Sequence, residues 1–195
     1  MKIGFAGSDN FSLKILSGLM EIIADSSLSL SLVLTISPKN KGRGKTLSET
    51  PVSSFSKKNN LFIKTISPSR NVVDSLEDTI SKLDYLIVAS FGYILNENIL
   101  SLPKHGCINV HPSLLPKWRG AAPIQRAIEA GDKVTGVSIM KMVLNLDAGP
   151  VWSIVKQEIS RNDTYVDLEE KLAKVSLQML QKFLKTPYDK ITYNS

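Results

Sequence analysis

The sequence YLIVA at residues Tyr85–Ala89 is a short apolar run with no charged interruption. A continuous apolar strand of this kind is typical of a parallel sheet that helices cover on both faces. Two further strands are predicted at Lys2–Ala6 and Ser29–Ile36. Between them, apolar residues repeat at helical spacing, at Leu16, Leu19, Met20 and Ile23. This alternation predicts an α/β fold with a doubly wound, mostly parallel sheet.

The remaining chain continues the alternation and ends in a long amphipathic helix. Thr164 and Asp167 have the spacing of a capping box, and Pro187 ends the helical pattern. We expect one domain over residues 1–187 and a short tail or truncated linker at residues 188–195. The other predicted elements are a Gly- and Lys-rich loop from Pro38 to about Thr46, helices from about Pro51, at Val72–Lys82 and at Pro123–Ala130, and strands at Leu61–Ile66, Cys107–Val110, Gly136–Met142 and Pro150–Ile159.

Composition limits the class of protein. The chain has 195 residues, of which 43% are hydrophobic, and no apolar run approaches the roughly 20 residues of a membrane span. Its first residues resemble a buried strand and not a signal peptide, so we expect a cytoplasmic protein. The single cysteine, Cys107, excludes an internal disulfide and a cysteine-built metal site, and we expect no metal. The net charge of +6 permits a polyanionic partner such as RNA without requiring one.

Two candidate catalytic residues lie at the C-terminal end of the strand predicted at Cys107–Val110. Asn109 and His111 are two residues apart, so an extended chain places both side chains on one face. A neutral imidazole can accept an amine proton near neutral pH, and an amide can donate to a developing oxyanion. Asp147, in a tight turn before Gly149, could orient the imidazole. Each residue also has a purely structural interpretation. His111 could serve only as a structural hydrogen-bonding residue, and Asn109 could cap backbone groups at the end of the strand. Asp147 could hydrogen-bond to the backbone of its own turn.

Four further segments bear on ligand binding. The turn Ser113-Leu114-Leu115-Pro116 sets backbone polar groups beside apolar side chains, which suits a flat heteroaromatic ligand or a plain loop exit. Gly7–Asn10 lacks the Gly-x-Gly-x-x-Gly pattern of a dinucleotide site, and Gly44–Thr46 lacks the first glycine of a phosphate loop. The fourth segment, residues 39–58, gathers several cations, which are opposed there only by Glu49. These cations form either a solvated face or a polyanion site: Lys39, Lys41, Arg43, Lys45, Lys57 and Lys58.

The segment CINVHPSLLPKWRGAAPIQR at Cys107–Arg126, with LDAG at Leu146–Gly149, resembles the catalytic domain of methionyl-tRNA formyltransferases. These belong to the 10-formyltetrahydrofolate-dependent formyltransferases, which share the Asn-x-His and Leu-Asp-x-Gly elements. The segments WRGAAPIQ at Trp118–Gln125 and GRGK at Gly42–Lys45 are more typical of the tRNA enzymes than of their purine-pathway or sugar-nucleotide relatives. The resemblance covers nearly the whole chain and implies a Rossmann-like formyltransferase fold.

The resemblance implies a mechanism and a set of site residues. The α-amine of initiator methionyl-tRNA would attack the formyl carbon of 10-formyltetrahydrofolate, with His111 as base, Asp147 holding the imidazole and Asn109 stabilising the oxyanion. The folate would lie against Ser113, Leu114, Leu115 and Pro116. The tRNA would contact Lys41, Arg43 and Lys45, and the protein would act as a monomer.

Two alternatives stay open at this point. The same chemistry could act on a small amine, such as a sugar nucleotide or glycinamide ribonucleotide. The chain could also be a degenerate folate- or RNA-binding protein without activity. Members of the family continue into a second, β-rich domain that helps to bind tRNA, whereas this sequence ends near the expected linker, which affects tRNA affinity more than chemistry.

Overall fold

The computed structural model describes residues 1–41, 46–67 and 76–194. The chain forms two compact units, Met1–Cys107 and Ile108–Ser195. Within the described ranges, none of the helices is long and apolar enough to cross a membrane.

Parallel strands form the sheet of the first unit, in the order β5-β2-β1-β6. Every residue of β6 is buried, as its uninterrupted apolar sequence predicts. The bounds of these strands are β1 (Lys2–Ala6), β2 (Ser29–Ile36), β5 (Ile63–Ile66) and β6 (Tyr85–Val88).

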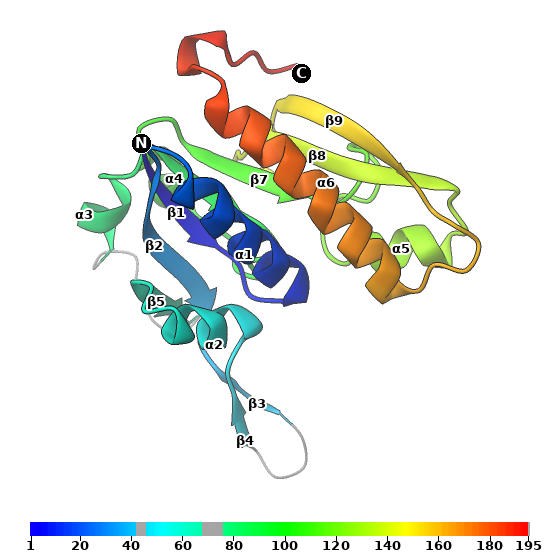
Figure 1. The fold of residues 1–195 in the computed structure, drawn as a ribbon, viewed down its shortest axis with the longest axis horizontal. Helices are drawn as coiled ribbons and strands as arrows, with labels where there is room; N and C mark the ends of the chain where they lie inside the picture. Colours follow the sequence, from blue (N-terminus) through cyan, green and yellow to red (C-terminus); the bar gives the residue numbers. More distant parts are fainter. Residues whose placement is uncertain (42–45, 68–75, 195) are drawn as a thin grey trace. The chain divides into compact units, whose positions relative to one another are not determined.

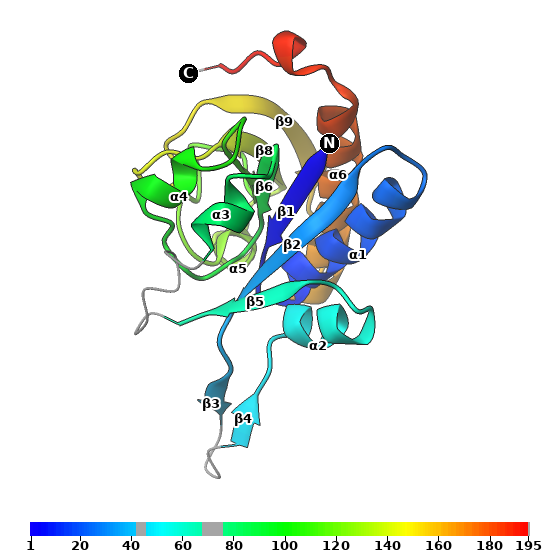
Figure 2. The same cartoon turned by 90° about the vertical axis from the view of Figure 1, so that its left-hand side faces the viewer.

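Helices lie on both faces of this sheet. Figure 2 shows α1 and α2 on one side of the strands and α3 and α4 on the other. The bounds are α1 (Asn10–Ala24), α2 (Pro51–Lys58), α3 (Glu77–Ile80) and α4 (Glu97–Ser101). Asp9 caps α1 by accepting the N–H of Ser12, and Thr50 caps α2 by accepting the N–H of Ser53. The predicted doubly wound α/β arrangement is therefore confirmed for this unit.

Hydrogen bonds of Ser8 join the loop after β1 to the last residue of β2 and to the loop after β6. The Ser8 hydroxyl donates to the carbonyl of Phe91 at 2.7 Å and accepts the N–H of Ile36 at 3.3 Å. Gly7 is required here, because an added Cβ would lie 2.5 Å from the Cβ of Ser12 and 2.9 Å from the carbonyl oxygen of Ala89. The carboxyl ends of the parallel strands are thus held as one edge, the edge at which ligands bind in doubly wound sheets.

The first unit differs from the sequence prediction in three places. The helix predicted at Val72–Lys82 is α3, which ends at Ile80, and residues 72–75 lie outside the described residues. The predicted loop after Pro38 contains two short antiparallel strands, β3 (Lys39–Lys41) and β4 (Thr46–Ser48). Residues 42–45 between them, including Arg43 and Lys45, lie outside the described residues. Helix α4 was not predicted, because its five residues are too few to show a helical repeat.

The second unit is built on three antiparallel strands and two helices. Strand β8 (Val134–Lys141) pairs with β7 (Cys107–His111) on one side and with β9 (Val151–Glu158) on the other. The predicted pair of strands before the last helix is therefore confirmed. The helices are α5 (Pro123–Glu129) and α6 (Tyr165–Lys185).

Helix α6 packs against β8, β9 and α5 (Figure 1). Its N-terminus carries the predicted capping box, in which the Thr164 side chain accepts the N–H of Asp167 and the Asp167 side chain accepts the N–H of Thr164. The Phe183 ring of α6 meets the Trp152 ring of β9 edge-on, with 5.1 Å between centroids.

The residues after α6 are tied to the start of β9. A short 3-10 helix, η1 (Tyr188–Lys190), is followed by a bridge between Asn194 and Val151. The two residues exchange backbone hydrogen bonds of 2.7 and 2.8 Å. This segment therefore contributes one wall to the site described below.

Candidate active site

Asn109 and His111 leave the same side of β7 and are both buried, with 9% and 5% of their surface exposed. Asp147 comes from the loop between β8 and β9 and is 8% exposed. Its φ of 46° is left-handed, a conformation that aspartate tolerates better than most residues. This turn directs the Asp147 carboxylate back toward β7.

The Asp147 carboxylate contacts Asn109, Gly120 and His111. Its Oδ1 accepts a hydrogen bond from Asn109 Nδ2 at 2.9 Å, and its Oδ2 accepts the N–H of Gly120 at 2.8 Å. The same Oδ2 lies 3.6 Å from His111 Nδ1, too long for a hydrogen bond but close enough for an ion pair with a protonated ring. The structure therefore brings together the three predicted catalytic side chains.

The other ring nitrogen of His111 defines the tautomer. Nε2 lies 2.9 Å from the carbonyl oxygen of Trp118. A carbonyl can only accept, so Nε2 carries the proton, and in the neutral ring the lone pair is on Nδ1. If Nδ1 gains a proton, each N–H of the imidazolium faces an acceptor, Trp118 O or Asp147 Oδ2. The site is thus arranged to receive a proton on Nδ1.

The predicted folate segment divides into two parts. Ser113 is fully buried and its hydroxyl donates to the carbonyl of Lys117 at 2.6 Å, so it holds the turn. Leu114 packs over Gly136, where an added Cβ would lie 2.4 Å from its Cδ2. Leu115 and Pro116, joined by a cis peptide bond, line a pocket. The structure therefore places only Leu115 and Pro116 at this pocket.

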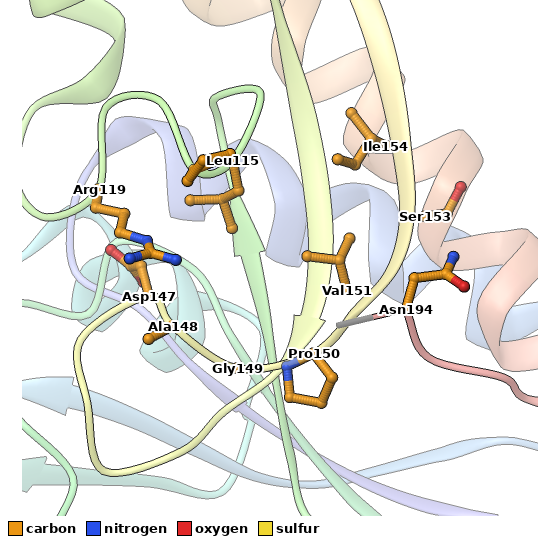
Figure 3. Close-up of a pocket in the computed structure, with 11 residues that line it drawn as sticks. Leu115, Arg119, Asp147, Ala148, Gly149, Pro150, Val151, Ser153, Ile154 and Asn194 are labelled. Atoms are coloured by element: carbon orange, nitrogen blue, oxygen red, sulfur yellow. The ribbon is translucent and has the colours of Figure 1, made fainter.

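The pocket has a volume of about 710 Å³, within the roughly 300–1,000 Å³ of small-molecule sites. Figure 3 shows its walls, which come from the turn after β7, the loop before β9, the first residues of β9 and the C-terminal segment. Asp147 lines one part of it, together with Arg119 and Asn194. Arg119 and Asn194 were not predicted from the sequence as site residues. Arg119 lies in the quoted WRG motif, whereas nothing in the local pattern around Asn194 indicates a role.

The structure describes only some of the remaining candidate residues. Lys41 ends β3, and Arg43 and Lys45 lie outside the described residues. Lys57 forms an ion pair with Glu49, and its hydrogen bond lowers the pKa of the Glu49 carboxyl. Burial raises the pKa of Cys107 to about 12, so its thiol is no nucleophile at neutral pH. In the described part of the chain, no three His, Cys, Asp or Glu side chains are grouped to hold a metal ion.

A family model described as "Formyl transferase" matches residues 1–184. The chain belongs to the formyl transferase family. It is 41% identical to the methionyl-tRNA formyltransferase of Wolbachia sp. subsp. Drosophila simulans (strain wRi), over 94% of this chain and 60% of that protein. It is 44% identical to the methionyl-tRNA formyltransferase of Thermotoga neapolitana, over 94% of this chain and 58% of that protein. The chain thus spans about 60% of the length of these formyl transferases.

Solved structures of other formyl transferases share the fold. The phosphoribosylglycinamide formyltransferase from Bacillus halodurans superposes with a TM-score of 0.74 at 22% identity, over 98% of this chain and 99% of its own. The corresponding protein from Anaplasma phagocytophilum gives a TM-score of 0.77 at 22% identity, over 95% of this chain and 85% of its own. These similarities confirm the expected Rossmann-like formyltransferase fold.

Proposed function

We propose that this formyl transferase moves a formyl group from 10-formyltetrahydrofolate to the α-amino group of initiator methionyl-tRNA. The observation that carries the proposal is the convergence of Asn109, His111 and Asp147 beside a pocket of ligand size. The names of the relatives at about 40% identity support methionyl-tRNA as the acceptor. The expected cytoplasmic location, the monomeric state and the division into a domain at residues 1–187 and a tail at 188–195 stay predictions.

The site supplies the proton transfers of this reaction. When the amine nitrogen bonds to the formyl carbon, the carbonyl π electrons move to the oxygen and the lone pair of His111 Nδ1 takes the amine proton. The imidazolium then keeps Nε2–H on Trp118 O and presents Nδ1–H to Asp147. The oxyanion pair then re-forms the carbonyl bond as the carbon–nitrogen bond to the folate breaks. The electron pair of the broken bond stays on the folate nitrogen, which takes the amine-derived proton from His111 and leaves the imidazole neutral.

The remaining residues stabilise charge and bind substrate. The Asn109 amide carries two hydrogens, of which one is given to Asp147, and the second serves the oxyanion. Leu115 and Pro116 supply apolar surface for the folate, as the sequence resemblance implies for the segment from Ser113. Arg119 is the only cationic side chain among the described residues that line the pocket, and it suits an anionic group of either substrate.

A formylation assay with two acceptors tests the proposal. The full chain is incubated with 10-formyltetrahydrofolate and either methionyl initiator tRNA or glycinamide ribonucleotide, and the formylated product is quantified. We expect transfer to methionyl-tRNA. Transfer to the small amine alone would contradict the acceptor, and no transfer to either, with folate still bound, would favour the degenerate binding protein.

Binding of tRNA is expected to weaken with salt if Lys41, Arg43 and Lys45 contact phosphates. Three phosphate contacts predict a loss of affinity of about 20- to 40-fold between about 50 and 200 mM salt. Arg43→Ala removes one phosphate contact, so it should reduce the slope of log affinity against log salt by about 1. The measurement is a binding titration across a salt series. Lys104→Ala removes the same charge from an exposed site outside this segment and is expected to leave the slope nearly unchanged.

A further inference from the structure

Asp132 holds the side chain of Trp118 in place. The indole Nε1–H of Trp118 donates to Asp132 Oδ2 at 2.8 Å, and Lys117 Nζ donates to Oδ1 at 2.7 Å. The Lys117 ammonium also lies 5.1 Å from the centre of the Trp118 ring. Hydrogen bonds from Lys117 and then Trp118 lower the pKa of the Asp132 carboxyl, which keeps it ionised at neutral pH.

The backbone of Asp132 is itself anchored. It follows helix α5, and its N–H donates to the carbonyl of Ala127 at 3.0 Å. Its side chain is 14% exposed, against 52% for that of Lys117. The carboxylate is therefore a mostly buried and fixed acceptor, whereas its lysine partner lies largely in water.

Trp118 connects Asp132 to the candidate catalytic residues. Its φ of 58° is left-handed, a conformation that a bulky residue adopts only where its surroundings hold it. In this conformation its carbonyl lies 2.9 Å from His111 Nε2. Two residues later, the N–H of Gly120 donates to Asp147 Oδ2. The segment Trp118–Gly120 thus contacts both the imidazole and the carboxylate.

We propose that Asp132 is a positioning residue for formyl transfer. Through the indole of Trp118, it fixes the carbonyl that binds Nε2–H of His111 and so keeps the lone pair on Nδ1, facing Asp147. The kinetic part of this inference rests on the proposed function. The effect on the tautomer of His111 does not depend on it.

The test compares four variants of the full chain. Asp132→Ala removes the acceptor, and Trp118→Phe keeps a ring but removes the indole N–H. Asp132→Asn removes the charge but keeps an oxygen that can accept from the indole. Asp163→Ala is the matched control, because Asp163 forms an ion pair of 2.7 Å with Lys171 in the same unit.

Two measurements separate positioning from stability. The first is kcat and KM for formyl transfer. The second is the ¹⁵N chemical shift of each ring nitrogen of His111, recorded at about pH 8.5, where an ordinary histidine is neutral. The His111 signals are assigned by their loss in His111→Gln.

Asp132→Ala and Trp118→Phe are expected to lower kcat by about 10- to 100-fold with little change in KM, because the reacting groups are misplaced. Both should give a mixture of the two ring tautomers, whereas Asp132→Asn stays within about 3-fold of the wild-type rate. Asp163→Ala should change the denaturation midpoint, but it should change neither the kinetic constants nor the ¹⁵N chemical shifts of His111.

An unchanged tautomer in folded Asp132→Ala and Trp118→Phe would overturn the proposal, as would an equal effect of Asp163→Ala on kcat. If Asp132→Ala does not fold, Trp118→Phe decides alone, since it leaves the ion pair of Asp132 and Lys117 intact. If the wild-type chain formylates neither acceptor, the proposed function fails, and the tautomer measurement still decides the role of Asp132.

Discussion

Replacing His111 with alanine is expected to lower the rate of formyl transfer by about 10²–10⁴-fold, the usual contribution of a positioned acid–base group. The variant loses Nδ1, the atom that receives the amine proton, and it leaves the carboxylate of Asp147 without its cationic partner in the reaction. Substrate binding should change little, since the pocket walls do not include the imidazole. Single-turnover formylation at saturating folate measures the effect on the chemical step.

The other histidine of the chain provides the control. His105 lies in the first unit, in contact with the Tyr85 ring, and His105→Ala is expected to keep the wild-type rate. Added imidazole should restore part of the rate of His111→Ala, because the vacated space lies beside Asp147 and Trp118. A turnover of His111→Ala within about 3-fold of wild type would refute the role of His111 as base.

Asp147→Asn is expected to lower formyl transfer by about 10²–10³-fold, the range for loss of a preorganised electrostatic partner. Asp147 accepts N–H groups from Asn109 and Gly120 on its two oxygens. An asparagine has only one acceptor oxygen, so its NH₂ group must face one of these donors. The variant should also lose about 1–3 kcal/mol of unfolding free energy, because a buried N–H is left unsatisfied.

Two measurements on this variant separate chemistry from folding. Denaturant unfolding gives the stability loss, and single-turnover kinetics under native conditions gives the rate. Asn145→Ala, at an exposed position in the same loop, is the control and should change neither by much. If Asp147→Asn lost stability but kept its rate, the carboxylate would be a structural brace and not part of the reaction.

Local patterns account for the elements that were predicted correctly. The buried strand β6 and the capped helix α6 each repeat their own signal over several residues, and both lie where the sequence indicated. Short elements carry too few residues for such a signal. Helix α4 and the paired strands β3 and β4 were missed for that reason, although Asn96 does cap α4 through the N–H of Ile99.

The candidate site shows the same division between local and distant information. The two-residue spacing of Asn109 and His111 on a strand was enough to place both side chains on one face, because β geometry alternates at every residue. No such rule reaches Asp147, whose approach depends on the pairing of β7 with β8 and on a left-handed turn. The sequence marked Asp147 as a candidate by its turn, and only the family resemblance assigned it to the same site as His111.

What the amino-acid order alone determined is therefore the class of fold, most of its strands and helices, and the chemical types gathered at the end of β7. Folding decided the rest: which ring nitrogen of His111 bears the proton, and that Ser113 holds the turn while Leu115 lines the pocket. Folding also placed Asn194 at the pocket and the carboxylate of Asp132 on the indole N–H of Trp118. The reason is the distance along the chain over which each kind of interaction acts. Periodicity and capping act over a few residues, whereas these contacts join segments that meet only when strands pair and loops close.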